Sequence, residues 1–143
     1  MFTRTASARY EGFGKDGRGF VSSGSGVLSE QPYSFSTRFG EEPGTNPEEL
    51  VAAAHASCFT MALSFALAKE GFTEGSLATT AKVKIDKEGE GFRVTRSDLT
   101  LEATVPGIDE ERFAAAARGA EQNCPISKLL NAEISLDYRL NGS

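Results

Sequence analysis

Histidine and cysteine are scarce in this chain, and tryptophan is absent. The 143 residues include one histidine, His55, and two cysteines, Cys58 and Cys124. The cysteines stand far apart, so they form neither a Cys-x-x-Cys motif nor the short-spaced pairs of a zinc ribbon. At most three soft ligands are available, without a second histidine. This inventory argues against a metal centre.

Basic residues and long apolar runs are also few. The chain has 15 Lys and Arg against 20 Asp and Glu, for a net charge of −5, and its basic residues are scattered. Such a distribution lacks the basic stripe that binds a phosphate backbone. The first residues lack the apolar core of a signal peptide, and no unbroken apolar run approaches the roughly 20 residues that cross a bilayer. We therefore expect a soluble, cytoplasmic protein that binds neither nucleic acid nor membrane.

Length and hydrophobic content favour a single domain over residues 1–143, with mixed α and β structure. Hydrophobic residues make up 39% of the chain, and a domain of this size buries roughly two-thirds of its unfolded surface. The segment from Tyr33 to Arg38 alternates apolar and polar side chains, which predicts a strand with Arg38 on its more polar face. The expected strands are residues 5–10, 19–23, 33–38, 77–85, 92–105 and 134–140, of which the fourth and fifth form a hairpin.

A long helix is expected to start at residue 46. Asn46 is a good N-cap, Pro47 suits the first helical position, and Glu49 completes a start that resembles a capping box. The segment carries almost no charge until its last turn, and Gly71 then supplies a stop. A helix that is apolar on nearly every side must be covered by protein. Two shorter helices are expected at residues 110–122 and 126–130.

Cys58 lies in the middle of the long helix, where burial alone would raise the pKa of its thiol and make it inert. A reactive Cys58 therefore needs a nearby cation. Arg38 is the best candidate in the preceding segment, although a surface arginine on a strand is the simpler interpretation. Glu48 precedes Cys58 by ten positions, about 15 Å along a straight helix. Any contact between Glu48 and the Cys58 thiolate must then come from another chain, which predicts a composite site in a dimer.

Cys124 and His55 each allow two interpretations. Cys124 precedes Pro125 at the start of a short helix, where free backbone N–H groups stabilise a thiolate. It can equally be a small residue at a helix break. His55 precedes Cys58 by three positions and so shares its helical face. A lone histidine in an apolar helix is more often a hydrogen-bonded core residue than a metal ligand.

Three segments resemble the OsmC and organic hydroperoxide resistance (Ohr) family. They are GTNPEEL at residues 44–50, AAAHASCF at residues 52–59 and NCPIS at residues 123–127. The resemblance covers nearly the whole chain, and His55 together with an arginine before the long helix is typical of the OsmC branch. It implies an α+β, OsmC-like fold: an intertwined homodimer with long central helices packed between antiparallel sheets and with active sites at the interface.

The same resemblance implies a role for each site residue. Cys58 would be the peroxidatic cysteine, Cys124 the resolving cysteine, Arg38 the residue that activates the thiolate, and Glu48 the residue that orients Arg38. The thiolate would reduce an organic hydroperoxide, and the resulting Cys58–Cys124 disulfide would be reopened by a dithiol, in this family a lipoyl-linked one. No metal, haem, flavin or other cofactor is needed. Apolar residues near Cys58, namely Phe59, Met61 and Phe65, would favour organic hydroperoxides over hydrogen peroxide.

Other classes of function remain open from the residues alone. Two buried, inert thiols would resist alkylation in the folded protein. A redox sensor or binding protein would form the disulfide without turning over a dithiol. A cysteine hydrolase would pair Cys58 with a base, but His55 on the same helix points along the face rather than clearly across to the sulfur.

Overall fold

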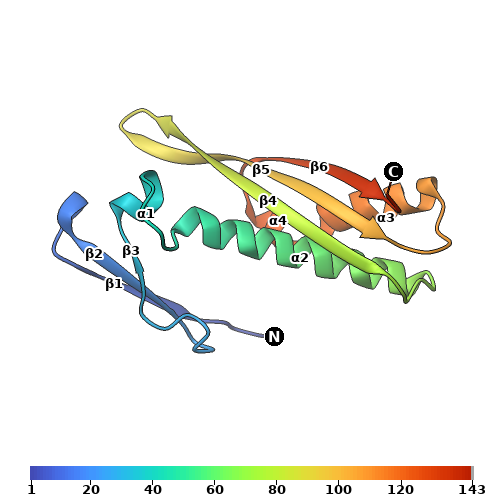
Figure 1. The fold of residues 1–143 in the computed structure, drawn as a ribbon, viewed down its shortest axis with the longest axis horizontal. Coiled ribbons are helices and arrows are strands. Elements are labelled where there is room, and N and C mark those ends of the chain that lie inside the picture. Colours follow the sequence, from blue (N-terminus) through green and yellow to red (C-terminus); the bar gives the residue numbers. More distant parts are fainter. Residues whose placement is uncertain (143) are drawn as a thin grey trace. The chain divides into compact units, whose positions relative to one another are not determined.

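The computed structural model describes residues 1–142 and forms two compact units, residues 1–50 and residues 51–143. The chain combines helices with two three-stranded sheets (Figure 1), as expected of an α+β protein. The single domain expected over residues 1–143 stays a prediction.

The first unit is built on an antiparallel sheet with the order β1-β2-β3. Gly19 of β2 faces two aromatic rings, and a Cβ at this position would lie 2.5 Å from the ring of Tyr33 and 2.9 Å from that of Tyr10. Only glycine therefore fits between these tyrosines. The strands are β1 Ala6–Glu11, β2 Arg18–Ser23 and β3 Gln31–Tyr33, and a short 3-10 helix, η1 Gly14–Asp16, lies between the first two.

The strand expected at residues 33–38 is wrong beyond its first residue, because the chain turns into the helix α1 Phe35–Phe39. Ser34 caps this helix, and its side chain and that of Thr37 each accept a hydrogen bond from the other's backbone N–H, at 3.3 and 2.8 Å. This reciprocal capping box favours a helix over a strand despite the alternating pattern. The rings of Phe35 and Phe39, one turn apart, then pack against each other in a tilted arrangement with centroids 5.2 Å apart. Arg38 consequently lies on a helix.

The long helix α2 Pro47–Lys69 begins as expected, since the Asn46 side chain accepts a hydrogen bond from the Glu49 N–H at 2.8 Å. Gly71, with φ of 97°, ends it in the left-handed region that favours glycine. The buried residues of α2 recur every fourth position and form one stripe, while Met61 and Phe65 on another face stay exposed. The buried residues are His55, Phe59, Leu63 and Leu67.

Length and composition alone would allow α2 to cross a membrane, because its most apolar window has a mean hydropathy of 1.7. The sequence expectation concerned an unbroken apolar run, and α2 contains His55, Ser57 and Thr60 within this window. The core helix of a water-soluble protein passes the same test, so the finding is weak evidence for a membrane. Only 22% of that window is buried within the chain.

The second unit contains a mixed sheet with the order β4-β5-β6. The first two strands form the expected hairpin, and β6 runs parallel to β5 after a crossover that contains two helices. The Asp109 side chain caps the first of these helices by accepting a hydrogen bond from the Arg112 N–H at 2.8 Å. The elements are β4 Ser76–Glu88, β5 Gly91–Thr104, α3 Glu110–Asn123, α4 Pro125–Leu129 and β6 Glu133–Leu140.

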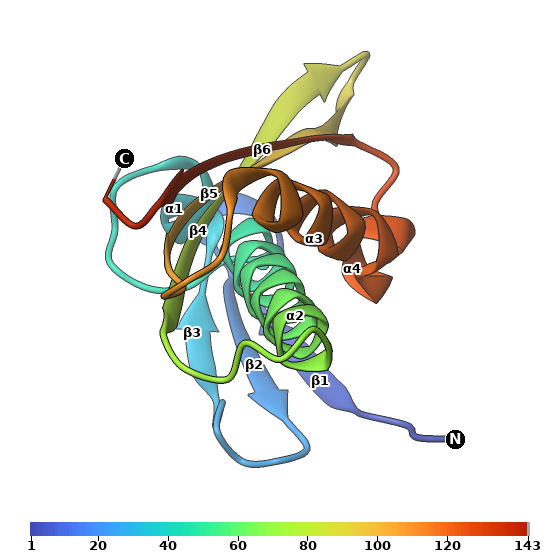
Figure 2. The same cartoon turned by 90° about the vertical axis from the view of Figure 1, so that its right-hand side faces the viewer.

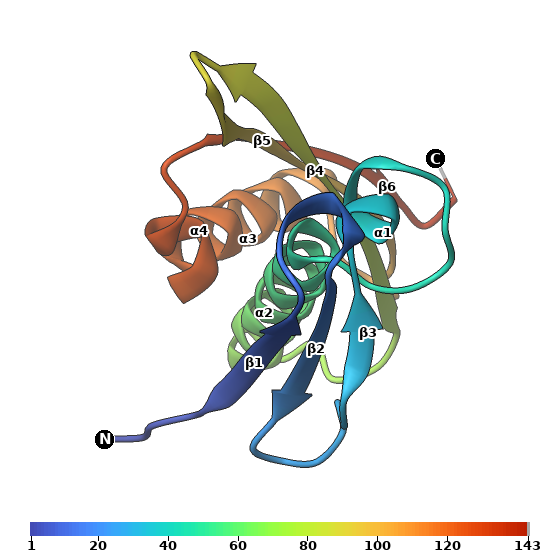
Figure 3. The same ribbon diagram turned by 90° about the vertical axis from the view of Figure 1, so that its left-hand side faces the viewer.

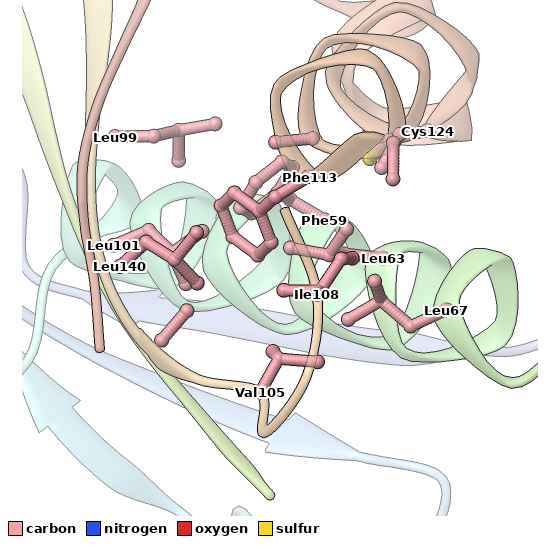
Figure 4. Packing of buried hydrophobic residues seen from close by; sticks show 14 residues of the cluster. Phe59, Leu63, Leu67, Leu99, Leu101, Val105, Ile108, Phe113, Cys124 and Leu140 are labelled. Atoms are coloured by element: carbon pink, nitrogen blue, oxygen red, sulfur yellow. The ribbon is translucent and has the colours of Figure 1, made fainter. Parts of the chain in front are cut away.

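The core of this unit lies between its sheet and its helices. Figure 2 shows α2 and α3 on the same side of the sheet, and Figure 3 shows the same arrangement from the opposite direction. Alternate residues of β5, from Ser97 to Ala103, point into the core. Figure 4 shows how Phe59, Leu101 and Phe113 from three elements meet, with Cys124 at the edge of the same cluster. Cys124 is thus held by a packed core.

Candidate active site

Cys58 lies half-buried on α2 and packs against the core cluster. Burial raises the pKa of its thiol, the neighbouring Cys124 thiol raises it further, and the backbone N–H of Ile126 only partly opposes this. The net pKa is above the ordinary value. Within its own unit, Cys58 is therefore a protonated thiol that needs an additional positive charge to become a nucleophile.

Cys124 lies fully buried at the junction of α3 and α4, ending one helix and preceding the other. Its backbone has φ of −58° and ψ of 125°, the extended conformation that a residue before proline prefers. Burial pushes the pKa of its thiol up, but Cys58, Ser127 and the backbone of Ile126 outweigh burial, and the net pKa is lowered. Cys124 is the N-cap residue of α4, so its side chain lies at the end of that helix where free backbone N–H groups are found.

 

Cys58 and Cys124 lie far apart in sequence, but in the fold Cys58 packs against the core cluster that contains Cys124. Both are free thiols, and each alters the pKa of the other. The pKa of Cys58 is raised and that of Cys124 is lowered, so the two thiols titrate as a coupled pair. Two neighbouring free thiols are the starting point for a disulfide.

Arg38 and Glu48 form a bidentate ion pair in the first unit. Arg38 Nε donates to Glu48 Oε1 and Arg38 Nη2 donates to Glu48 Oε2, both at 2.8 Å. The pair raises the pKa of Arg38, so the guanidinium stays charged at any working pH. Within residues 1–142, Nη1 makes no hydrogen bond, which leaves donors for a further anion. The structure brings together each pair of expected site residues, Cys58 with Cys124 and Arg38 with Glu48, inside its own unit.

His55 is the hydrogen-bonded core residue that its position in an apolar helix predicts. It is fully buried, with Nδ1 2.6 Å from Ser97 Oγ and Nε2 2.8 Å from Ser127 Oγ. Both ring nitrogens are thus engaged by hydroxyl groups, and neither is left to hold a metal. Sequence reasoning missed Ser97 and Ser127 as partners. The only available signals were an inward position on β5 for Ser97 and the NCPIS motif for Ser127.

Stability should depend on pH through His55. Burial lowers the pKa of His55 below its ordinary value of 6.5, so the folded protein keeps the ring neutral where the unfolded chain takes up a proton. The stabilisation is fully present above about pH 6.5 and is lost as the pH falls, by up to about 1.4 kcal/mol per pH unit. Urea unfolding between about pH 7.5 and about pH 5.5 measures this slope. A folded His55→Gln variant with the same slope would contradict the assignment.

The apolar residues expected around Cys58 divide between two environments. Phe59 belongs to the buried core, whereas Met61 and Phe65 are exposed. These two follow Cys58 by three and seven positions and so share its side of the helix. They line a shallow groove made entirely of residues from α2 and β4. The lining residues are Ala53, Ala56, Ser57, Thr60, Met61, Ser64, Phe65 and Thr79.

Comparison with known proteins identifies relatives along almost the whole chain. The chain is 52% identical over 137 residues to the peroxiredoxin OsmC of Escherichia coli, with 96% of each chain covered. It is 29% identical over 143 residues to the organic hydroperoxide resistance protein OhrB of Bacillus subtilis, covering 98% of each. Both relatives therefore span the two units.

Solved structures agree with these relatives. The crystal structure of Bacillus subtilis OhrB matches with a TM-score of 0.70 and 27% identity, over 96% of this chain and 98% of that one. An organic hydroperoxide resistance protein from Elizabethkingia anophelis matches with a TM-score of 0.72 and 28% identity, over 100% of this chain and 98% of that one. The family model described as "OsmC-like protein" matches residues 40–139 of this chain. The chain therefore belongs to the OsmC/Ohr family of OsmC-like proteins.

Proposed function

We propose that this chain reduces organic hydroperoxides to alcohols through Cys58 and Cys124. The observation that carries the proposal is the proximity of two free thiols from distant parts of the sequence, each of which alters the pKa of the other. Two inert core thiols need no such proximity. Together with 52% identity to a peroxiredoxin, it supports a cysteine-based peroxidase.

The chemistry runs in three steps. The Cys58 thiolate attacks the terminal peroxide oxygen, the O–O bond breaks, and the alkoxide leaves as an alcohol after taking a proton. Cys58 is left as a sulfenic acid. The Cys124 sulfur then attacks Cys58 Sγ, the S–O bond breaks, and hydroxide leaves to become water. A dithiol reductant, lipoyl-linked in the family, reopens the disulfide and is itself oxidised to a disulfide.

Arg38 supplies the positive charge that Cys58 lacks in its own unit, and Glu48 orients it. Glu48 lies about 15 Å along α2 from Cys58, so the Arg38–Glu48 pair acts on Cys58 of a second chain. The site is then composite, and the protein is a homodimer. The exposed apolar residues Met61 and Phe65 fit both a subunit contact and an apolar substrate.

The remaining parts of the proposal follow from composition and the site. The enzyme is cytoplasmic, where reduced dithiols are available, and functions as one domain over residues 1–143. It needs no cofactor, since thiol chemistry is sufficient for the whole cycle. Its partners are a hydroperoxide, a dithiol and a second copy of itself, with neither nucleic acid nor membrane required.

The proposal is tested by oxidising the reduced protein with cumene hydroperoxide. One equivalent should consume both thiols and yield one Cys58–Cys124 disulfide, identified by mass spectrometry of the digested protein. With a dithiol present, kcat/KM for cumene hydroperoxide should exceed that for hydrogen peroxide by roughly tenfold or more, because apolar contacts favour the aryl group. A disulfide that forms but is never turned over by any dithiol would indicate a redox sensor instead.

A further inference from the structure

A chain of hydrogen-bonded side chains runs through the core of the second unit and ends at Ser127, in the first turn of α4 that Cys124 caps. It starts at Ser97 on β5, passes through His55 on α2 and reaches Ser127 on α4, with separations of 2.6 and 2.8 Å. Ser97 and His55 are fully buried and Ser127 is 8% exposed. The Ser127 hydroxyl in turn favours the negative charge on Cys124. The two-cysteine chemistry proposed above assigns no role to these three hydrogen-bonded side chains.

Because His55 is neutral, the directions of the hydrogen bonds among Ser97, His55 and Ser127 are linked. A neutral imidazole has one N–H donor and one acceptor nitrogen. If the Ser127 hydroxyl donates to a Cys124 thiolate, its oxygen is free to accept from His55 Nε2–H. Nδ1 is then unprotonated and accepts from the Ser97 hydroxyl. Every group in the chain is satisfied when Cys124 is negatively charged.

The hydrogen bonds can also run in the opposite direction, with His55 as the other tautomer. In that arrangement Ser127 no longer donates a hydrogen bond to the Cys124 thiolate. With the proton on Nδ1, His55 donates to Ser97, and Nε2 accepts from the Ser127 hydroxyl. Ser127 then has no hydrogen left for the sulfur, and a Cys124 thiol can donate to Ser127 instead. The tautomer of His55 is therefore tied to the protonation of Cys124.

We propose that His55 and Ser127 are positioning residues that form a hydrogen-bond relay to Cys124, hold its side chain toward Cys58 and stabilise its thiolate. The inference rests on the proposed function, because it concerns the step in which Cys124 attacks the Cys58 sulfenic acid. That step forms the S–S bond, breaks the S–O bond and releases hydroxide. The same relay stabilises Cys124 as the leaving thiolate when a dithiol attacks Cys58 and reopens the disulfide.

A test of the relay must account for every group that shifts the pKa of Cys124. They are Cys58 on α2 and the neutral groups of Ile126 and Ser127 on α4, together with burial. Replacing Cys58 with serine removes the second thiol, so that the ultraviolet absorbance of the thiolate reports Cys124 alone. This titration needs neither peroxide nor turnover, so its result is independent of whether the peroxidase proposal holds.

In the Cys58→Ser background, Ser127→Ala should lower the thiolate fraction of Cys124 roughly tenfold at a pH below its midpoint, since a hydrogen bond to a charged group is lost. His55→Met should have a similar effect by removing the donor to Ser127. His55→Gln, whose amide can still donate, and Ser127→Thr, which keeps the hydroxyl, should restore most of the thiolate. Ser135→Ala is the matched control, because it removes a hydroxyl that bonds to Asp98 at 2.6 Å, away from the relay.

A second measurement uses the chain with both cysteines. After one equivalent of cumene hydroperoxide, the rate of disulfide closure should fall roughly tenfold in Ser127→Ala, while the rate of sulfenic acid formation stays unchanged. Circular dichroism of each variant identifies any that fail to fold. A thiolate titration in folded Ser127→Ala that matches the Ser135→Ala control overturns the relay. A protein that shows the titration shift without turning over peroxide overturns the peroxidase proposal alone.

Discussion

Replacing Cys58 with serine is expected to abolish hydroperoxide turnover, by at least about a thousandfold, because the attacking sulfur is lost. The measurement is consumption of cumene hydroperoxide with a dithiol reductant, with wild type and variant under identical conditions. Cys124→Ser is the matched control. It should complete about one turnover with its Cys58 sulfenic acid trappable by dimedone, and then lose activity as Cys58 is oxidised further.

The reverse outcome would have a structural explanation. In its own unit, Cys124 has the lowered pKa and Cys58 the raised one. If Cys58→Ser kept the first turnover and Cys124→Ser lost it, the roles of the two cysteines would be exchanged. The assignment of Cys58 as the nucleophile therefore depends on the charge that Arg38 brings.

Mixed dimers give the second large expected effect. Arg38→Met should reduce activity about a hundredfold by removing a charged donor, and Cys58→Ser should be inactive. When the two variants are co-refolded, half of the dimers are mixed. In each mixed dimer, one composite site combines Arg38 of the Cys58→Ser chain with Cys58 of the Arg38→Met chain and is intact, whereas the other site lacks both residues. Because about half of the dimers are mixed and half of their sites are intact, activity should recover to about a quarter of wild type.

The control for this experiment is the mixture of separately folded variants before any exchange of subunits, which should stay inactive. A mixture that stays inactive after co-refolding, while size-exclusion chromatography shows dimers, would mean that Arg38 serves Cys58 of its own chain. A protein that elutes as a monomer and is fully active would exclude a composite site altogether.

The long elements were predictable because local signals agree with the fold. Asn46 and Pro47 mark the start of α2, Asp109 marks that of α3, and alternating residues mark the β4–β5 hairpin. The segment after Tyr33 was not predictable from alternation. Its Ser and Phe residues suit either period, and the choice is made by the reciprocal hydrogen bonds between Ser34 and Thr37.

The site was predictable only in part. Family resemblance drew attention to Cys58 and Cys124, but their unequal pKa values depend on burial and on the amides of α4, which appear only in three dimensions. The partners of His55 lie 42 and 72 positions away. No local pattern links residues at such separations, because tertiary packing alone brings them together.

The parallel pairing of β5 with β6 has a consequence for the whole catalytic cycle. Parallel strands need a long crossover, and here the crossover contains α3, α4 and Cys124. A disulfide to Cys58 covalently ties the crossover to α2. Each round of oxidation would thus crosslink the segment that completes the sheet, and each reduction would release it, so the oxidised enzyme should be the form that resists unfolding more strongly.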